Sequence, residues 1–311
     1  MKSQANVFVL SSLLVSCLSL FAQQKGQWVP GQSGLNAGVL PDAGFTFANL
    51  TLNYSATELK DEKGSSIPTQ GSYGFWIPEQ VFYYVPSAKV LGGKLAFVAL
   101  MPFANGSVTA PTFGASAGGE GYSDTYVQPA TLGWNLKHVD TYVAYGFAAP
   151  TGTFFPGSSS NNGSGYFGND FVTGTTAYLT KNKATTLNLT TAWEFHGQKK
   201  GTNIIPGQAF TDEWGLGQII PLKKDLTRLA QLGIIGYDQW QVSANQGVTA
   251  TFPFYSVHAI GIQSNLIFPT RGLMAYFKYE PEYLAKARPQ GRTFAFGFSW
   301  TLRDPKTTAK P

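Results

Sequence analysis

The sequence has few of the groups that covalent, redox or metal chemistry needs. Of its 311 residues, one is cysteine, Cys17, and three are histidine. A single thiol forms no disulfide within the chain, and a structural thiolate metal site uses several cysteines. Charged residues make up only 13% of the chain, which is low for a soluble globular protein. After the amino terminus no apolar run approaches the roughly 18 consecutive residues of a membrane-spanning helix. Disulfide-rich and helical membrane classes are therefore excluded.

What the sequence has instead is alternation, which is clearest in residues 273–302. Large apolar side chains occupy every other position in the second half of this stretch: Phe294, Phe296, Phe298, Trp300 and Leu302. Small or polar residues stand between them, and this is the period of a strand with one apolar face. The first half places Lys278, Glu280 and Glu282 opposite its aromatic residues. Charges on one face and aromatics on the other, at mid-strand, are typical of a strand between lipid and water.

The chain divides into about a dozen segments of this kind. They are residues 44–54, 75–86, 92–104, 122–136, 138–150, 167–181, 185–197, 209–222, 226–242, 253–269, 271–284 and 291–302. Long polar connections alternate with short turns, so that all the long loops fall at one end. An even number of strands with this arrangement predicts an all-β fold, an antiparallel transmembrane β-barrel of about 12 strands, with long loops outside the cell and turns in the periplasm. Aromatic residues near the segment ends fit interfacial girdles: Trp76, Tyr83, Tyr84, Trp134, Tyr166, Trp214, Trp240 and Trp300.

The two ends of the chain differ from the rest. Lys2 precedes an apolar stretch that ends at Ala22, which predicts a secretory signal peptide at 1–22 and export to the bacterial outer membrane. Acylation of Cys17 after lipoprotein-type cleavage is the alternative. Residues 23–302 are then the predicted barrel, and residues 303–311 are a polar carboxyl-terminal tail.

Several short motifs occur in the order found in a known bacterial family. They are Gly92-Gly93-Lys94 before Met101-Pro102; Asp124 and Pro129 before Leu132-Gly133-Trp134; Ala149 to Phe154; Glu194-Phe195 before Pro206-Gly207; and Tyr279-Glu280 before Arg288-Pro289-Gln290-Gly291. In these motifs the chain resembles the family named for a putative meta-pathway of phenol degradation. The resemblance implies an outer-membrane barrel that passes small molecules, aromatic or hydrophobic ones among them. Many barrels of this kind end on an aromatic residue, whereas this chain ends in a polar tail. The difference bears on how the last strand is presented to the barrel-assembly machinery.

A barrel of about twelve strands leaves room for a narrow lumen. The frames of the strands point a set of polar and aromatic side chains inward, and these are the candidates for a solute path: Lys94, Asp140, Tyr142, Asn188, Glu194, His196, Glu213, Tyr276, Lys278, Glu280 and Glu282. Their mixed charges argue against strong ion selectivity, and Tyr142 and Tyr276 offer faces on which aromatic solutes could stack. The same charges would also suit a plugged barrel in which they neutralise one another.

Two further functions stay open at this stage. Ser256 and His258 share an apparently lipid-facing frame, as in a phospholipase-type outer-membrane hydrolase, although the sequence shows no third group to orient the histidine. A structural or adhesive barrel without transport is the other alternative. We expect no catalytic residues, no metal site and no cofactor. The expected partners are outer-membrane lipid, a small-molecule solute and the barrel-assembly machinery. Nucleic acid is not expected, because the basic residues of this exported chain are scattered.

Overall fold

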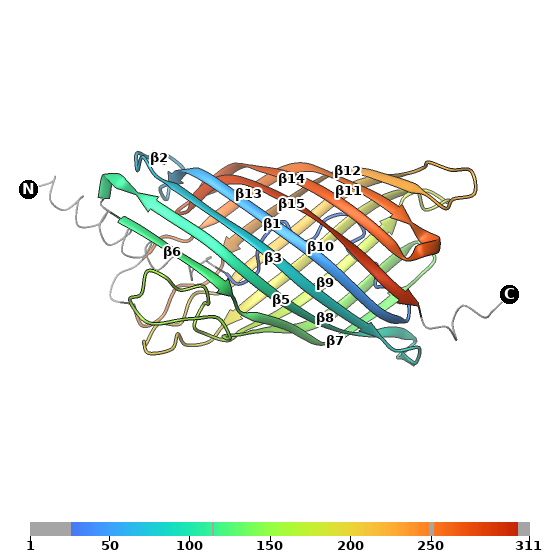
Figure 1. The fold of residues 1–311 in the computed structure, drawn as a ribbon, viewed down its shortest axis with the longest axis horizontal. Helices are drawn as coiled ribbons and strands as arrows, with labels where there is room; N and C mark the ends of the chain where they lie inside the picture. Colours follow the sequence, from blue (N-terminus) through green and yellow to red (C-terminus); the bar gives the residue numbers. More distant parts are fainter. Residues whose placement is uncertain (1–25, 114, 249–251, 304–311) are drawn as a thin grey trace, which may run out of the picture.

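The computed structural model describes residues 26–113, 115–248 and 252–303. In it, twelve long antiparallel strands form one sheet whose last strand pairs with its first, so that the wall closes into a barrel (Figure 1). The predicted fold class and strand number are confirmed. The predicted signal peptide, the alternative acylation site at Cys17 and all of the predicted tail after Arg303 lie outside the described residues. Within the described part of the chain, no helix has the length and apolar character needed to cross a membrane.

The twelve wall strands follow the predicted segments closely. They are β1 (Gly44–Lys60), β3 (Ser72–Val85), β5 (Gly93–Ala110), β7 (Thr125–Asn135), β8 (Val139–Ala149), β9 (Gly168–Tyr178), β10 (Thr185–His196), β11 (Ala209–Pro221), β12 (Leu229–Gln241), β13 (Ser256–Phe268), β14 (Leu273–Lys286) and β15 (Pro289–Arg303). The shorter elements are β2 (Ser66–Ile67), β4 (Lys89–Val90), β6 (Ala115–Tyr122) and the 3₁₀ turns η2 (Pro111–Phe113) and η3 (Pro269–Arg271).

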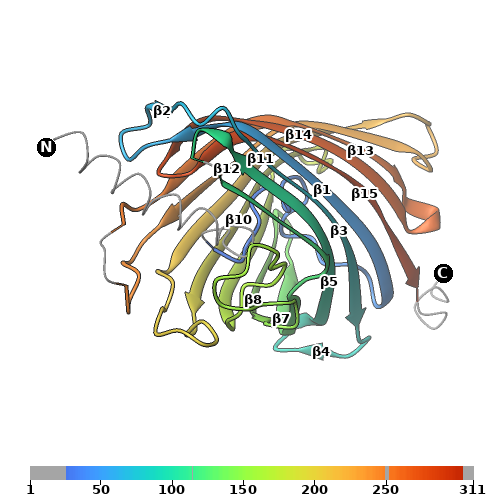
Figure 2. The same cartoon turned by 60° about the vertical axis from the view of Figure 1, so that its left-hand side comes forward.

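Strand β5 extends beyond its wall neighbour β7 at its carboxyl-terminal end. The first half of β5 pairs with β7, whereas its second half pairs with β6, which continues the sheet beyond the start of β7. Figure 2 shows this β5–β6 hairpin at the front of the barrel. Proline interrupts the hydrogen-bond ladder here, since Pro78 in β3 and Pro102 in β5 lack the amide hydrogen that a ladder uses.

Alternation along each strand gives the barrel two different surfaces. On β15, Phe296, Phe298 and Trp300 are exposed on the outer wall, whereas Thr293 and Ala295, in the other frame of the strand, are buried. The same reading holds on β14, where Phe277 is exposed and Lys278 is buried. Burying polar residues while exposing aromatics is the reverse of a soluble sandwich, and it matches a wall with hydrocarbon outside.

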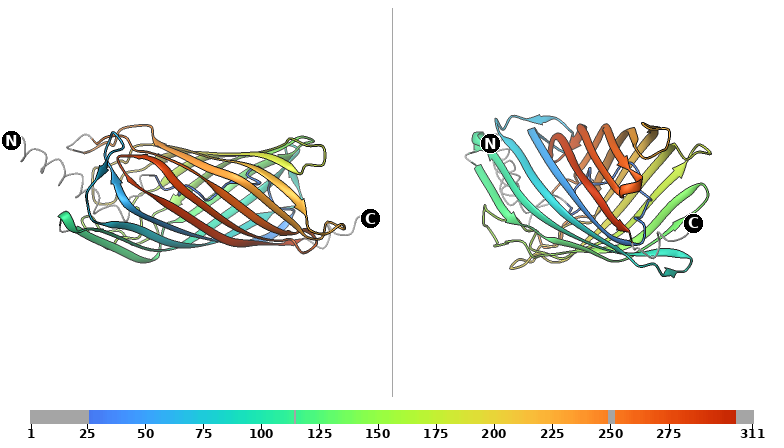
Figure 3. Two further views of the ribbon diagram at one scale, coloured as in Figure 1. Left: turned by 90° about the horizontal axis from the view of Figure 1, so that it is seen from above. Right: turned by 45° about the vertical axis from the view of Figure 1, so that its right-hand side comes forward.

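The two rims of the barrel carry different connections. At one rim, called here the loop rim, the strands are joined through residues 61–71, 111–124, 150–167, 197–208 and 242–255. At the other, the turn rim, the connections are residues 86–92, 136–138, 179–184, 222–228 and 269–272; β1 begins and β15 ends there. The left view of Figure 3 shows the barrel from above, with the end of β15 at the turn rim. The predicted alternation of long loops and short turns is confirmed except at the last hairpin, where residues 287–288 alone join β14 to β15 at the loop rim.

The predicted aromatic girdle is correct only in part. Trp76, Tyr84 and Trp300 are exposed on the outer wall near strand ends. Tyr166, in contrast, is only 2% exposed, because the loop 150–167 folds back over the lumen. Tyr83 lies in the inward frame of β3, between the buried Val81 and Val85. Placing Tyr83 and Tyr166 in the girdle was therefore wrong, since position near a strand end does not determine which face a side chain occupies.

Candidate functional site

The lumen is occupied by the chain itself. Residues 26–43, called here the inner segment, precede β1 and pass through the barrel from the loop rim to the turn rim. Figure 2 shows this stretch as the blue trace inside the wall. Its first residues contact Glu194 near the loop-rim end of β10, and its last residues contact Lys94 near the turn-rim end of β5. The sequence analysis gave these residues no separate role within the barrel domain.

Two wall carboxylates hold the part of the inner segment that is nearer the loop rim. Glu213 accepts hydrogen bonds from Trp28 Nε1 at 2.7 Å and from the amide of Ser33 at 2.7 Å. Glu194 accepts one from the amide of Trp28 at 2.9 Å and a shorter one from the amide of Gln27. Both glutamates are fully buried. Each side chain accepts two hydrogen bonds from the segment, so the pair fixes the height of the segment in the lumen.

The buried ammonium of Lys278, on β14, also holds this stretch. Lys278 Nζ donates to the carbonyl oxygens of Gly31 and Gln32, each at 3.0 Å, and to that of Ser33. Gly31 has φ = +92°, a conformation that strongly favours glycine, and a Cβ here would lie 3.0 Å from Glu280 Oε2. The bend of the inner segment at this residue therefore turns three carbonyl groups toward the lysine.

The part of the inner segment nearer the turn rim is held by amide side chains and by a close approach of its backbone to the wall. Asn188 Oδ1 accepts from the amide of Asn36 at 2.9 Å, and Gln263 Oε1 accepts from that of Leu35 at 3.0 Å. Further down, the amide of Gly38 donates to Thr176 Oγ1 at 2.9 Å. A Cβ on Gly38 would lie 2.1 Å from the carbonyl oxygen of Asp140, so only glycine allows this contact with the wall.

The structure places the eleven predicted lumen residues in two groups. The side chains of five of them form hydrogen bonds with the inner segment: Lys94, Asn188, Glu194, Glu213 and Lys278. The side chains of the other six form no hydrogen bond with it in the described chain. Asp140 accepts from Tyr178, Tyr276 donates to the carbonyl of Asn49, and His196 lies between Glu194 and the carbonyl of Gly207. Glu282 accepts from Tyr54 and Tyr237 and lies 3.6 Å from Arg288. Tyr142 packs on a cluster of Leu40, Val85 and Ala96, and Glu280 Oε2 has no hydrogen-bond partner in the described chain. As a solute path the whole set stays a prediction.

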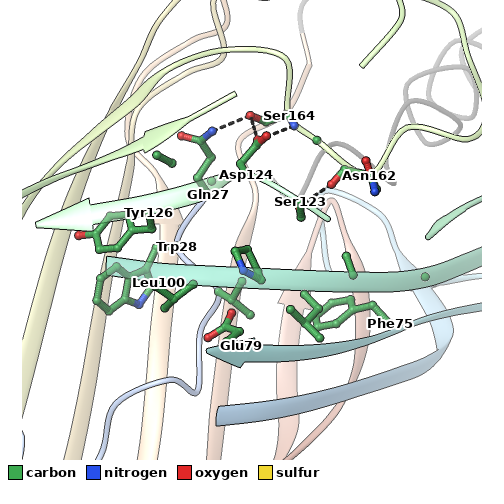
Figure 4. Close-up of a pocket in the computed structure, with 18 of the residues that line it drawn as sticks. Gln27, Trp28, Phe75, Glu79, Leu100, Ser123, Asp124, Tyr126, Asn162 and Ser164 are labelled. Atoms are coloured by element: carbon green, nitrogen blue, oxygen red, sulfur yellow. Dashed lines mark hydrogen bonds between the residues drawn. The ribbon is translucent and has the colours of Figure 1, made fainter. Parts of the chain in front are cut away.

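A cavity of about 140 Å³ remains beside the inner segment, toward the loop rim (Figure 4). One side is formed by Gln27, Trp28 and Val29 of the inner segment, and the other by side chains of β3, β5, β7 and the loop 150–167. The ring-bearing side chains in its wall are Trp28, Tyr73, Phe75 and Tyr126. Trp28 meets Tyr126 edge to face with ring centres 6.5 Å apart. Glu79 of β3, which the sequence analysis did not select, also lines the cavity and is 2% exposed.

The end of the cavity nearest the loop rim is polar, and its groups are paired with one another. Asp124 accepts from the amide of Ser164 at 2.7 Å and from its hydroxyl at 2.5 Å. Gln27 Nε2 in turn donates to Ser164 Oγ at 2.6 Å, and Ser123 Oγ donates to the carbonyl of Asn162 (Figure 4). The loop 150–167 is thereby tied to the inner segment and closes the cavity above.

A polar cluster lies on the outer wall, close to the loop rim. His258 Nδ1 lies 2.5 Å from Asp238 Oδ1, and Asp238 Oδ2 accepts from Trp214 Nε1 at 3.2 Å. Asp238 is the orienting group that the sequence did not reveal, because it lies on the neighbouring strand. No hydrogen bond joins Ser256 to His258 in the described chain, and the Trp240 ring packs edge-on against the imidazole at 5.5 Å. Among the described residues no group of three or more His, Cys, Asp and Glu side chains could hold a metal ion.

Comparisons with known proteins agree with this architecture. The family model described as "Putative MetA-pathway of phenol degradation" matches residues 56–298. A COG4313 outer membrane channel from Pseudomonas putida F1 has a similar fold, with a TM-score of 0.73 and 13% identity over 89% of this chain and 100% of that chain. The beta domain of the Bordetella autotransporter BrkA gives a TM-score of 0.52 and 12% identity over 84% of this chain and 100% of that chain. A comparison with curated protein sequences finds no significant match. The fold, the apolar outer wall and the matching family place the protein in the outer membrane.

Proposed function

Because this chain belongs to the family described as "Putative MetA-pathway of phenol degradation", we propose that it is an outer-membrane channel for small molecules, aromatic or hydrophobic ones among them. The observation that carries the proposal is the filling of the lumen. The wall is closed by continuous strand pairing, whereas the space inside is filled by residues 26–43, which take no part in that pairing. A purely structural barrel has no need of a separate segment along its axis.

The way the inner segment is held makes it the movable part. Its contacts are hydrogen bonds, including those from the ammonium groups of Lys94 and Lys278, and its few buried apolar residues are Val29, Leu35 and Leu40. Water that enters the lumen can replace hydrogen bonds of this kind at a modest net cost of about 1 kcal/mol each. The strand ladder cannot open in the same way, because its unpaired backbone groups would face hydrocarbon. A solute route therefore requires the segment to shift within a rigid wall.

The lumen walls support weak rather than strong selection by charge. Lys278 faces Glu213 and Glu280, while Arg288 faces Glu282, so that neither sign dominates. A ring of one sign would favour one class of ion. The eleven predicted lumen residues would then line the route of a solute after the segment moves.

Uptake by intact cells tests this function. Cells of a Gram-negative host that carry the barrel in the outer membrane should take up radiolabelled phenol faster than cells without it, because the lipopolysaccharide leaflet slows apolar solutes. Arabinose serves as a polar solute of similar size. Equal rates for both solutes with and without the barrel would contradict a channel and favour a structural or adhesive role.

The outer-wall cluster favours a second candidate, a hydrolase of lipid esters. Asp238 orients His258 as a catalytic carboxylate would. We assign it no catalytic role, because Asp238 also accepts from Trp214 and the imidazole is packed against Trp240. This predicts that the purified barrel releases no fatty acid from phospholipid vesicles and that Ser256→Ala changes nothing. Fatty-acid release that Ser256→Ala abolishes would establish the hydrolase instead.

A further inference from the structure

The size of the cavity beside Trp28 fits one aromatic ring. Its volume is about 140 Å³. An apolar cavity of roughly 150 Å³ stays dry in water and takes up one benzene molecule. The walls suit such a guest, because Trp28, Tyr126 and Phe75 present ring faces and edges, and Leu100 and Ile77 are aliphatic. Two fused rings would exceed the space unless the inner segment moved.

One polar atom in this apolar part of the cavity lacks a partner. Glu79 is 2% exposed and lines the cavity, and its Oε2 has no hydrogen-bond partner in the described chain. Leaving a buried carboxyl oxygen unpaired is unfavourable, so an atom of this kind calls for a partner that is not part of the chain. Oxygens of Asp140, Glu194 and Glu280 are also unpaired in the described chain, but Glu79 is the one of these four that lines the cavity.

The charge of the cavity wall narrows the class of guest further. The described lining residues include Glu79, Asp124 and Asp170 but no lysine, arginine or histidine. The hydrogen bonds of Asp124 are already made to Ser164, and among the described lining carboxyl groups it is Glu79 that has an oxygen without a partner, so a guest in the ring-sized part would meet Glu79. A guest that carries a carboxylate would be buried there with no cationic side chain among the described lining residues to pair with, which is unfavourable.

We propose that this cavity is a binding site for single-ring aromatic molecules that carry a hydrogen-bond donor, a hydroxyl or amino group, which donates to Glu79. The site excludes aromatic carboxylates. The proposal rests on the proposed function, because it names the solutes that the lumen selects. The inner segment is then one wall of the binding site as well as the plug, since Gln27, Trp28 and Val29 line the same cavity.

Equilibrium dialysis of the purified full-length protein in detergent tests the site. Phenol and anisole have the same ring and oxygen, but anisole lacks the donor. Phenol should bind about tenfold more tightly than anisole, the value of one hydrogen bond to a buried carboxyl oxygen. Aniline should resemble phenol, and benzoate should bind more weakly than anisole. Ala104→Phe fills the cavity, so the binding that remains in this variant measures the uptake of each compound by the detergent alone.

Two substitutions at Glu79 separate its chemistry from its shape. Glu79→Leu should reduce phenol affinity to that of anisole and leave anisole unchanged. Glu79→Gln keeps an acceptor oxygen and should keep the preference for phenol over anisole. Glu62→Leu, on an exposed loop, is the matched control. Heat-modifiable migration on a gel reports whether each barrel is folded, and if Glu79→Leu fails to fold, Glu79→Gln and the ligand series decide.

Equal affinities of the wild-type protein for phenol and anisole would overturn the proposal, as would phenol binding that survives both Glu79→Leu and Ala104→Phe. The outcomes are also separable from the channel function. If phenol binds as predicted but does not enter cells faster through the barrel, the site stands and the channel fails. If cells take up phenol and anisole equally and no Glu79 variant alters binding, the channel stands and the site is overturned.

Discussion

The indole Nε1 of Trp28 donates a 2.7 Å hydrogen bond to Oε1 of Glu213, a residue 185 positions further along the chain. This bond joins the inner segment to the wall at the level of the cavity, and the other carboxylate oxygen of Glu213 accepts from the amide of Ser33. Lys278 binds the same part of the segment. Plug, wall and cavity are therefore one connected unit, which leads to predictions about opening, stability and pH.

Removing the carboxylate of Glu213 should loosen the inner segment. Glu213→Leu deletes two hydrogen bonds and leaves Lys278 with one fewer carboxylate nearby. We expect the hold on the segment to weaken by about 2 kcal/mol or more. Planar-bilayer recordings should show more frequent open events than the wild-type protein. Asp212→Asn, on the outer face of the same strand, is the control and should leave opening unchanged. Identical records for Glu213→Leu and the wild type would show that this contact does not hold the plug.

A charge on the outer wall should be costly in proportion to its depth. Ile262, at the middle of β13, is 57% exposed on the outer face. Ile262→Lys should reduce the free energy of unfolding by about 2 to 4 kcal/mol, because the ammonium would stand in hydrocarbon. Leu222→Lys, in a turn at the rim, should change it by less than about 1 kcal/mol. Urea unfolding in phospholipid vesicles measures both. Equal effects at the two positions would mean that Ile262 does not face lipid.

The closed form of the loop 197–208 should become more stable as the pH rises. Lys199 is 3% exposed, and its Nζ lies 5.5 Å from the Phe154 ring centre and 5.9 Å from that of Tyr166. Burial lowers the pKa of Lys199 from 10.5 to about 8. An opened loop restores the ordinary pKa, so between about pH 8 and 10.5 the closed form binds fewer protons than the open form. The stability of the closed form therefore rises across this window. Below about pH 8 the closed form carries the full free-energy cost of burying the charged ammonium of Lys199.

Lys199→Met should remove that penalty. At pH 7 the closed loop of the variant should be more stable by at most about 3 kcal/mol, less whatever the two ring contacts contribute. Subtilisin should therefore cut this loop more slowly in the variant at pH 7, and the difference should fade as the pH approaches 10.5. Lys200→Met, at the exposed neighbour, serves as the comparison. A variant that is cut faster than the wild type at pH 7 would mean that the ring contacts outweigh burial.

The barrel wall could be predicted from the sequence because the alternation that specifies it involves residues close together in the chain. Phe296 and Phe298 alternate with small residues, and this period alone decides which face meets lipid. The twelve strands and the two unlike rims follow from the same signal and from the lengths of the connections. Tyr83 and Tyr166 were misplaced because nearness to a strand end was used where the frame, or the path of a loop, decides.

The candidate site could be predicted only in part. The inward frame does mark Glu213 and Lys278 as lumen residues, but no period marks residues 26–43, which have no regular secondary structure. Their partners lie far away in the sequence, as Gln27 and Glu194 do, 167 positions apart. Glu79 stands beside Pro78, where the strand ladder is interrupted, and only the fold reveals the cavity it lines. Asp238 next to His258 likewise follows from strand pairing rather than from spacing.

A disulfide between the inner segment and the wall tests the central claim most directly. Ser33 Oγ and Thr190 Oγ1 lie 2.6 Å apart, so cysteines at both positions need only a small shift to bond. With Ser33→Cys and Thr190→Cys combined, phenol uptake by intact cells should fall under oxidising conditions to the level of cells without the barrel, and dithiothreitol should restore it. Each single variant should take up phenol in both conditions. If phenol uptake through the oxidised double variant were as fast as after dithiothreitol treatment, the account would be contradicted, because the solute would then cross without any movement of residues 26–43.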